Sequence, residues 1–429
     1  MSFLGLRLNR HISPILAASL AQIWLGRVNL VDAFALVWFV FGGGYRSFFA
    51  SFSRHYSCLG LFYLTSLFLL LSDVINQTEI ATLLKGFGAY LIFPTTVLFL
   101  IGQFTVNQLW IFNLVVMLLN IFFNKSDVIE QGFSQETFKF GFSYAAVFLV
   151  LQLVESFFGR AGLLSCSFLS TMAISLLGAW GNLRLLAFVA TVSFGMIILF
   201  RFLPQFRLPQ RNRSYVLLAT AIVFPSALIG LSLLYSSFSQ NLLYLIPLDF
   251  IDPDAALKTV QQSSGDLGIL FGGRGEIFSA VLAWLDKPIL GWGSWAKDPF
   301  AQYSIAGGNI MEQLNYAKDI SWLDQFTTEQ GSLLIPAHSV LWAALVWGGG
   351  LAFLPAYFFL IQFLQIVVSA IRSKSVQPKY RHVFIACFSM WTLLFSPFGF
   401  SNRIQLAMMT AFTISWFQSV ENEAAVADQ

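Results

Sequence analysis

Two side chains in the only long polar interval of this chain suit a transfer reaction with a phosphate leaving group. Arg274 stands in the run GGRGEIFSAVLAWLDKPILGWG (272–293), and His338 follows in PAHSVL (336–341). A guanidinium stays charged and binds phosphate through two parallel hydrogen bonds. An imidazole titrates near neutral pH and accepts a proton as a general base. A histidine at a membrane interface can also simply bond to backbone, and that alternative stays open.

Two further arginines are expected on the same side of the protein. Arg184 lies at the start of one apolar run, and Arg403 begins the last one. Several guanidinium groups together would suit a lipid-linked pyrophosphate. Other interpretations stay open for each of them. Arg274 can form a salt bridge with Glu276 or Asp286, and the other two arginines can extend to lipid headgroups.

Motifs for other chemistries are missing from the sequence. It contains no P-loop, no H-E-x-x-H, no G-x-S-x-G and no dinucleotide fingerprint, and its carboxylates show no metal-ligand spacing. The three cysteines, Cys58, Cys166 and Cys387, fall far apart in or beside apolar runs, so we expect neither a disulfide nor a metal site from them. We therefore predict no cofactor, no metal ion and no nucleic-acid partner.

The composition indicates an all-α polytopic membrane protein. Of the 429 residues, 57% are hydrophobic and only 10% are charged, against about 25% charged residues in soluble domains. A spanning helix needs roughly 20 apolar residues, and such runs recur along the chain. They predict about twelve spans: 12–26, 29–44, 57–75, 80–101, 107–123, 137–155, 162–181, 185–202, 214–236, 339–371, 383–399 and 404–419. In the long run at 339–371, Gly348-Gly349-Gly350 and Pro355 favour a tilt, a kink or an extension beyond the bilayer.

The polar interval divides the chain into three parts. Residues 1–236 form a bundle of about nine helices, 237–337 a long, partly helical loop, and 338–429 about three helices with a short tail. The loop holds 11 acidic and 5 basic residues, whereas the whole chain has a net charge of +3. Since Lys and Arg in short loops favour the cytoplasmic side, both termini are predicted inside and the acidic loop outside. Segments 274–286 and 309–325 are expected to be helices within it.

At this point the residues resemble a known family. The pattern begins with Arg274, an aromatic residue four positions later and P-x-x-G-x-G at 288–293. It continues with a histidine before a helix that contains Gly348 to Gly350. It is similar to the shared region of the O-antigen ligase and O-antigen polymerase superfamily, over about residues 180–350. The family usually has Trp where Phe278 stands and Asn where Ser339 stands.

The resemblance implies a metal-independent, inverting glycosyltransferase in the bacterial inner membrane, with its active site in the periplasm. The donor would be a glycan on undecaprenyl pyrophosphate, and the acceptor a hydroxyl of a lipid A-core or of another glycan, beside the surrounding membrane lipids. His338 and Arg274 are the expected catalytic residues. The expected substrate-binding residues are Arg184, Arg403, Trp284, Gly291 and Gly293.

Several functions remain open on these residues, among them a protein O-glycosylation ligase as a further variant of the same transfer and a purely structural membrane scaffold. An O-antigen ligase is favoured, with an O-antigen or exopolysaccharide polymerase as the alternative that shares the donor and differs in the acceptor. A lipid-linked oligosaccharide flippase belongs to another class. It would be expected to place polar groups in the middle of broken helices, and this pattern is not evident in the sequence.

Overall fold

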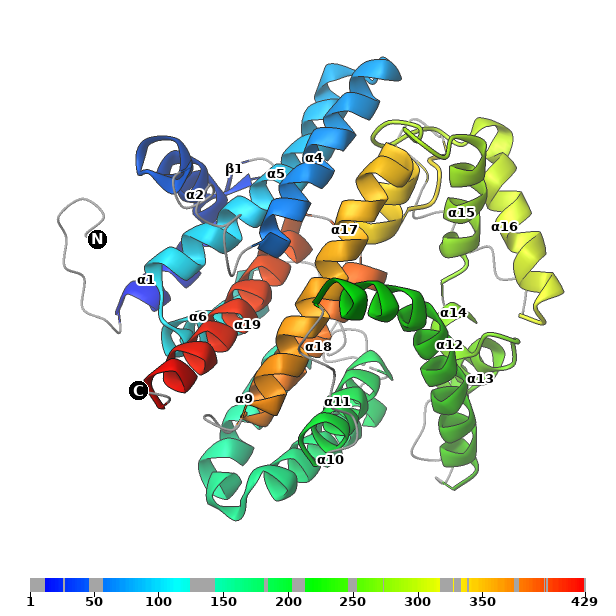
Figure 1. Cartoon of the computed structure of the whole chain (residues 1–429). Helices are drawn as coiled ribbons and strands as arrows, with labels where there is room; N and C mark the ends of the chain where they lie inside the picture. Colours follow the sequence, from blue (N-terminus) through cyan, green and yellow to red (C-terminus); the bar gives the residue numbers. More distant parts are fainter. Residues whose placement is uncertain are drawn as a thin grey trace.

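Among the residues that the computed structural model describes, the regular structure is helical, apart from one antiparallel pair of two-residue strands, β1(Trp24–Leu25) and β2(Val28–Asn29). Figure 1 shows the arrangement of the helices. The described residues are 12–25, 28–45, 57–123, 143–180, 184–202, 213–245, 253–272, 274–316, 327, 333–337, 339–373, 378–396, 398 and 400–427.

Six helices in this part of the chain are long and apolar enough to cross a membrane. Each coincides with a span expected from hydropathy, so the chain is a helical, membrane-embedded protein. These helices are α4(Ser57–Ile75), α5(Ile80–Gln103), α9(Ser143–Phe158) with the 3-10 turn η3(Gly159–Ala161), α11(Arg184–Ile197) with the π-helical turn η4(Ile198–Phe202), α12(Arg213–Leu245) and α17(Val340–Arg372).

The other six expected spans correspond to helices whose described residues do not meet the length and hydropathy of a membrane span, so the count of twelve stays a prediction. The nine residues of α1 and the twelve of α2 give lengths of about 14 and 18 Å, well short of a hydrocarbon core of about 30 Å. In α18 every residue is buried, so its apolar side chains serve contacts with neighbouring helices. The six helices are α1(Ile12–Leu20), α2(Leu30–Phe41), α6(Val106–Phe123), α10(Leu163–Trp180), α18(Tyr380–Phe395) and α19(Phe400–Ala427).

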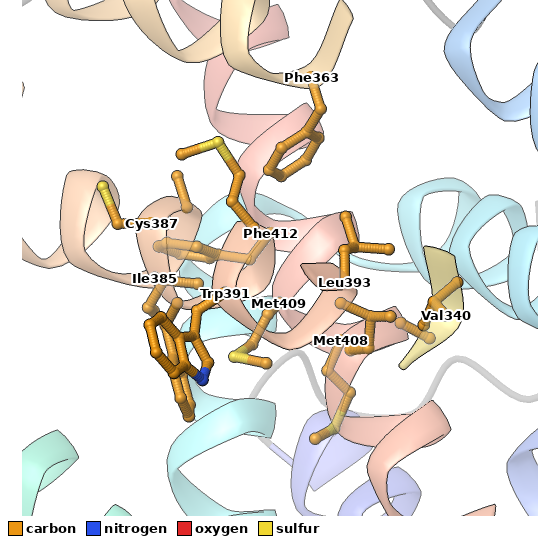
Figure 2. Packing of buried hydrophobic residues seen from close by; sticks show 14 of the residues in the cluster. Val340, Phe363, Ile385, Cys387, Trp391, Leu393, Met408, Met409 and Phe412 are labelled. Carbon is orange, nitrogen blue, oxygen red and sulfur yellow. The ribbon is translucent and has the colours of Figure 1, made fainter. Parts of the chain in front are cut away.

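The helix α17 lies at the centre of the fold and contacts α4, α12, α15(Glu276–Asp286), α18 and α19 (Figure 1). Its most extensive partner is α4. Side chains from α17, α18 and α19 form a continuous buried cluster that includes Val340, Phe363, Leu393 and Met408 (Figure 2). This core holds the start of α17 in place.

The expected kink in α17 is confirmed, and it reverses the chain. Gly349 has φ 61° and ψ −158°, which interrupts the helix. The rings of Trp342 and Phe353 stack with centroids 6.4 Å apart, although eleven positions in a straight helix span about 16 Å. Residues 340–348 and 350–372 therefore fold back on each other, and only the second segment has the length of a membrane span.

The polar interval carries helices of its own between α12 and α17. They are α13(Pro253–Ser263), α14(Ile269–Gly272), α15, the 3-10 turn η7(Pro299–Ala301) and α16(Gln302–Gln313). The expected helix at 274–286 is confirmed as α15. The other expectation, 309–325, begins too late, because the Asp298 carboxylate accepts the Tyr303 and Ser304 amide hydrogens and starts α16 earlier. Residues 317–325 lie outside the described part.

Candidate functional site

The loop after α15 docks into the break of α17. Hydrogen bonds run from Gly350 N to Pro288 O at 2.7 Å and from Leu351 N to Ile289 O at 3.2 Å. In the other direction, Trp292 N donates to Val346 O and Gly293 N to Trp347 O, both at 2.9 Å. These bonds satisfy the backbone groups that a helix break leaves without partners. The two Gly-bearing motifs noted in the sequence, 288–293 and 348–350, are thus one structural joint.

The glycines of this joint are required by close packing. Gly291 has φ +67° and Gly293 φ +82°, values that L side chains rarely adopt. A Cβ at Gly291 would lie 2.5 Å from Gly349 N, and one at Gly293 would lie 2.4 Å from Thr78 Oγ1. Both glycines therefore have a packing role, and their contribution to substrate binding stays a prediction.

The end of α4 holds the joint from the other side, which sequence reasoning missed. The Asp73 carboxylate accepts the Ser294 amide hydrogen at 2.5 Å and the Ser294 hydroxyl at 2.8 Å. Asn76 Nδ2 donates to Gly291 O at 3.2 Å, and Ser72 Oγ to Trp347 O at 2.6 Å. The available signal was a run of polar residues closing an otherwise apolar helix. Such residues at a helix end can satisfy neighbouring backbone groups.

Arg274 and Glu276 form the charged part of the candidate site. Arg274 lies on the turn before α15, and Glu276 is the first residue of that helix. Arg274 Nη1 is 3.7 Å from Glu276 Oε1, and the two side chains are 27% and 8% exposed. This distance is too long for a hydrogen bond, so Glu276 does not use up the donors of the guanidinium. The salt bridge to Glu276 considered from the sequence is confirmed, and the one to Asp286 is not, since Asp286 accepts the Tyr303 hydroxyl at 2.6 Å.

Burial raises the pKa of the Glu276 carboxyl, and the charge of Arg274 partly opposes this shift. A buried carboxylate with one loosely held cation is an unusual arrangement, and such groups cluster at functional sites. Sequence reasoning treated Glu276 only as a salt-bridge partner. Its position two residues after Arg274 was the signal that it belongs to the site.

Two of the tryptophans in this region, Trp284 and Trp292, donate hydrogen bonds to backbone carbonyl groups. Trp284 is half-buried, and its indole donates to Pro288 O at 2.9 Å. Trp292 donates to Ala283 O at 2.7 Å, and the Lys287 ammonium lies 4.1 Å from the centre of its ring. Trp284 therefore shapes the joint, and its expected contact with sugar stays a prediction.

Arg403 is buried rather than extended to lipid headgroups. Its Nη2 lies 2.6 Å from Asp32 Oδ2, and both side chains are at most 5% exposed. The other oxygen, Asp32 Oδ1, accepts the Thr96 hydroxyl at 2.7 Å. This pair ties α19 to α2 and α5. Binding of substrate by Arg403 stays a prediction, with its guanidinium already engaged by a carboxylate.

Two expected site residues fall where no side chain is described. Arg184 begins α11, but its side chain lies outside the described part. His338 lies outside the described residues altogether, and it directly precedes Ser339, the N-cap of α17. The Ser339 hydroxyl accepts the Trp342 amide hydrogen at 3.2 Å. Ser339 is thus the N-cap of α17, at the position where the family that the sequence resembles usually has Asn.

The described residues contain no group of three His, Cys, Asp or Glu side chains that could hold a metal ion. No family model, curated protein or solved structure matches this chain. The site must therefore be judged on its own geometry. Chemically, it offers a partly open guanidinium beside a buried carboxylate, on a helix that contacts α17, which starts two residues after a histidine.

Proposed function

We propose that this protein is a membrane glycosyltransferase that moves a glycan from an undecaprenyl-pyrophosphate carrier to an acceptor hydroxyl. The proposal rests on the sequence resemblance and on one structural observation, the joint between Gly291 and Gly349. Both α15 and residues 340–348 lead into this joint, and α15 also contacts α17. The joint thereby links the helix that follows Arg274 to the helical segment that follows His338.

The proposed roles follow from charge. A pyrophosphate leaving group gains negative charge as the glycosidic bond breaks, and a fixed guanidinium stabilises that charge. Arg274 supplies this cation, Arg184 adds a second, and Glu276 orients Arg274. His338 accepts the proton of the attacking hydroxyl. Attack opposite the phosphate inverts the anomeric centre, and the arginines provide the countercharge without a metal ion.

The favoured acceptor is a lipid A-core, which makes the protein an O-antigen ligase of the inner membrane with a periplasmic site and cytoplasmic termini. A polymerase shares every step except the acceptor. A flippase is less favoured, because the break in α17 has its backbone groups occupied by the loop rather than open to a transported ion or substrate.

The first experiment measures the glycan left on the carrier in cells that lack this protein. Long polymer on the carrier, with none on cell-surface lipid, identifies a ligase. Single repeat units on the external face identify a polymerase. Units stranded on the cytoplasmic face overturn the enzyme proposal in favour of a flippase.

Variants then test the residues. Arg274→Gln should lower transfer by about 10²–10³-fold, Arg274→Lys should retain more activity, and His338→Ala should abolish transfer. Lys297→Gln is the matched control, since Lys297 is an exposed cation on the same loop and should leave transfer unchanged. Full activity in both Arg274→Gln and His338→Ala would remove the basis of the proposal.

A further inference from the structure

A charged cavity lies at the end of the bundle away from the joint. From Gly349, residues 350–372 run about 34 Å to Arg372, and α18 begins a few residues later at Tyr380. The cavity lies where α9, α10 and α18 meet, in the lower part of Figure 1, and has a volume of about 440 Å³. Its lining includes Glu155, Arg160, Cys166, Ser170, Lys379 and Arg381. Under the topology predicted from Lys and Arg, this end faces the cytoplasm.

The charges in this cavity are unbalanced. Glu155 is its one carboxylate, and it pairs with both Lys379 and Arg381. Arg160 is a third cation in the lining; it is exposed and makes no ion pair with the described residues. Three cations face one anion, so the cavity carries an excess of two positive charges. An anionic ligand would find both the space and the countercharge.

Arg381 gives the cavity a fixed positive charge. It is only 8% exposed, and its guanidinium carbon lies 4.6 Å from the centre of the Trp110 ring. Trp110 is itself anchored, because its indole donates to Gln152 Oε1 at 2.8 Å. Arg381 Nε lies 3.2 Å from Glu155 Oε2, yet neither atom makes a hydrogen bond among the described residues. Arg381 is thus a charge held in place by Trp110 and Glu155, while the exposed Arg160 and Lys379 supply donors that a phosphate group can reach.

We propose that this cavity binds a phosphate group, either in the headgroup of an anionic phospholipid or as a soluble phosphate ion. The volume is ample for a phosphoglycerol headgroup. Leu151, Leu163 and Tyr380 in its lining offer apolar walls beside the charges, as a lipid at the membrane surface requires. Basic pockets between membrane helices bind lipid headgroups in the same way.

The test uses the purified full-length protein in detergent and native mass spectrometry. Phosphatidylglycerol, phosphatidylcholine and inorganic phosphate are the probes. We expect retention of phosphatidylglycerol over phosphatidylcholine. Arg160→Gln and Lys379→Gln should each weaken this binding about fivefold, which corresponds to about 1 kcal/mol per cation. Both side chains are more than a third exposed, so these variants should fold, and their thermal midpoints check this.

Arg372→Gln is the matched control. It removes a cation at the same end of the bundle, where Arg372 stacks on Phe200 outside the cavity. Unchanged binding in this variant supports the cavity site. Preferential loss of inorganic phosphate in Arg160→Gln and Lys379→Gln also supports it and assigns the soluble ligand. Equal binding by the wild type and both cavity variants overturns the proposal, as does an equal loss in Arg372→Gln.

Discussion

Gly291 and Gly349 lie backbone against backbone, with no room for a side chain on either. A Cβ at Gly291 would lie 2.5 Å from Gly349 N, and a Cβ at Gly349 would lie 2.6 Å from Gly291 N. Both residues also have positive φ, +67° and +61°. This contact fixes where the polar loop sits on α17, and with it the start of the helix that follows His338.

Alanine at either glycine should therefore destabilise the protein. We expect Gly291→Ala and Gly349→Ala each to cost about 2 kcal/mol or more, from overpacking and from forcing an L residue to positive φ. Thermal unfolding in detergent measures the effect. Gly308→Ala in α16 is the control, because nothing lies within 4 Å of its added Cβ. Its midpoint should be unchanged or higher, and equal midpoints for all three variants would refute the joint.

The buried pair of Asp32 and Arg403 predicts strong coupling between two distant parts of the chain. Asp32→Asn or Arg403→Gln leaves one buried group without its countercharge, which costs about 3–5 kcal/mol. The double variant should lose less than the sum of the single losses. Lys85→Gln, an exposed cation on α5, controls for the loss of charge. Additive losses in thermal unfolding would show that the pair does not interact.

The features of the fold that depend only on residues close in sequence could be predicted from local sequence patterns. The six membrane-length helices follow from apolar runs, and the break in α17 follows from three consecutive glycines, because helix formation and helix breaking are decided within a few turns. The helix α15 also follows from its periodic apolar face. For the same reason Arg274 and Glu276, two residues apart, could be considered as a pair from the sequence.

Long-range pairing could not be predicted in this way. Arg403 meets Asp32 across 371 positions, and Ser294 meets Asp73 across 221. Nothing local specifies these partners. Hydropathy alone does not fix the number of membrane spans. An apolar helix such as α18 has the same hydropathy whether other helices or lipid surround it. The chain reversal at Gly349 depends on the loop segment 288–293, which occupies the helix break. Even the last residue of this segment, Gly293, lies 56 positions before Gly349 in the sequence.

Loss of the hydrogen bonds between Asp73 and Ser294 should loosen the loop 287–297 locally. Asp73→Asn removes a charge-assisted acceptor, and a hydrogen bond to a charged group contributes about 1.5–3 kcal/mol. Amide hydrogen exchange at residues 287–297 should then be about tenfold faster or more, with exchange in α5 unchanged. Ser264→Ala, whose hydroxyl bonds only to nearby carbonyls at the loop surface, should leave exchange at 287–297 as in the wild type. Identical exchange in Asp73→Asn would show that the anchor is not needed.

The raised pKa of Glu276 sets the sign of a pH dependence. Because burial lifts it above its ordinary value of 4.5, the folded protein binds this proton more tightly than the unfolded chain does. The contribution of Glu276 to stability is therefore greatest below pH 4.5. It falls as the pH rises through the raised pKa and is constant above it.

Glu276→Gln should remove this dependence. The thermal midpoint of the variant relative to wild type should rise between pH 4.5 and the raised pKa, since Gln carries no buried charge at any pH. Above that range the difference should stay level, because the wild-type carboxyl is then fully ionised beside Arg274. Glu312→Gln, on the exposed surface of α16, removes a carboxylate from the same loop and controls for net charge. A difference between Glu276→Gln and wild type that does not vary from pH 4 to pH 8 would contradict the burial of an ionisable group at this position.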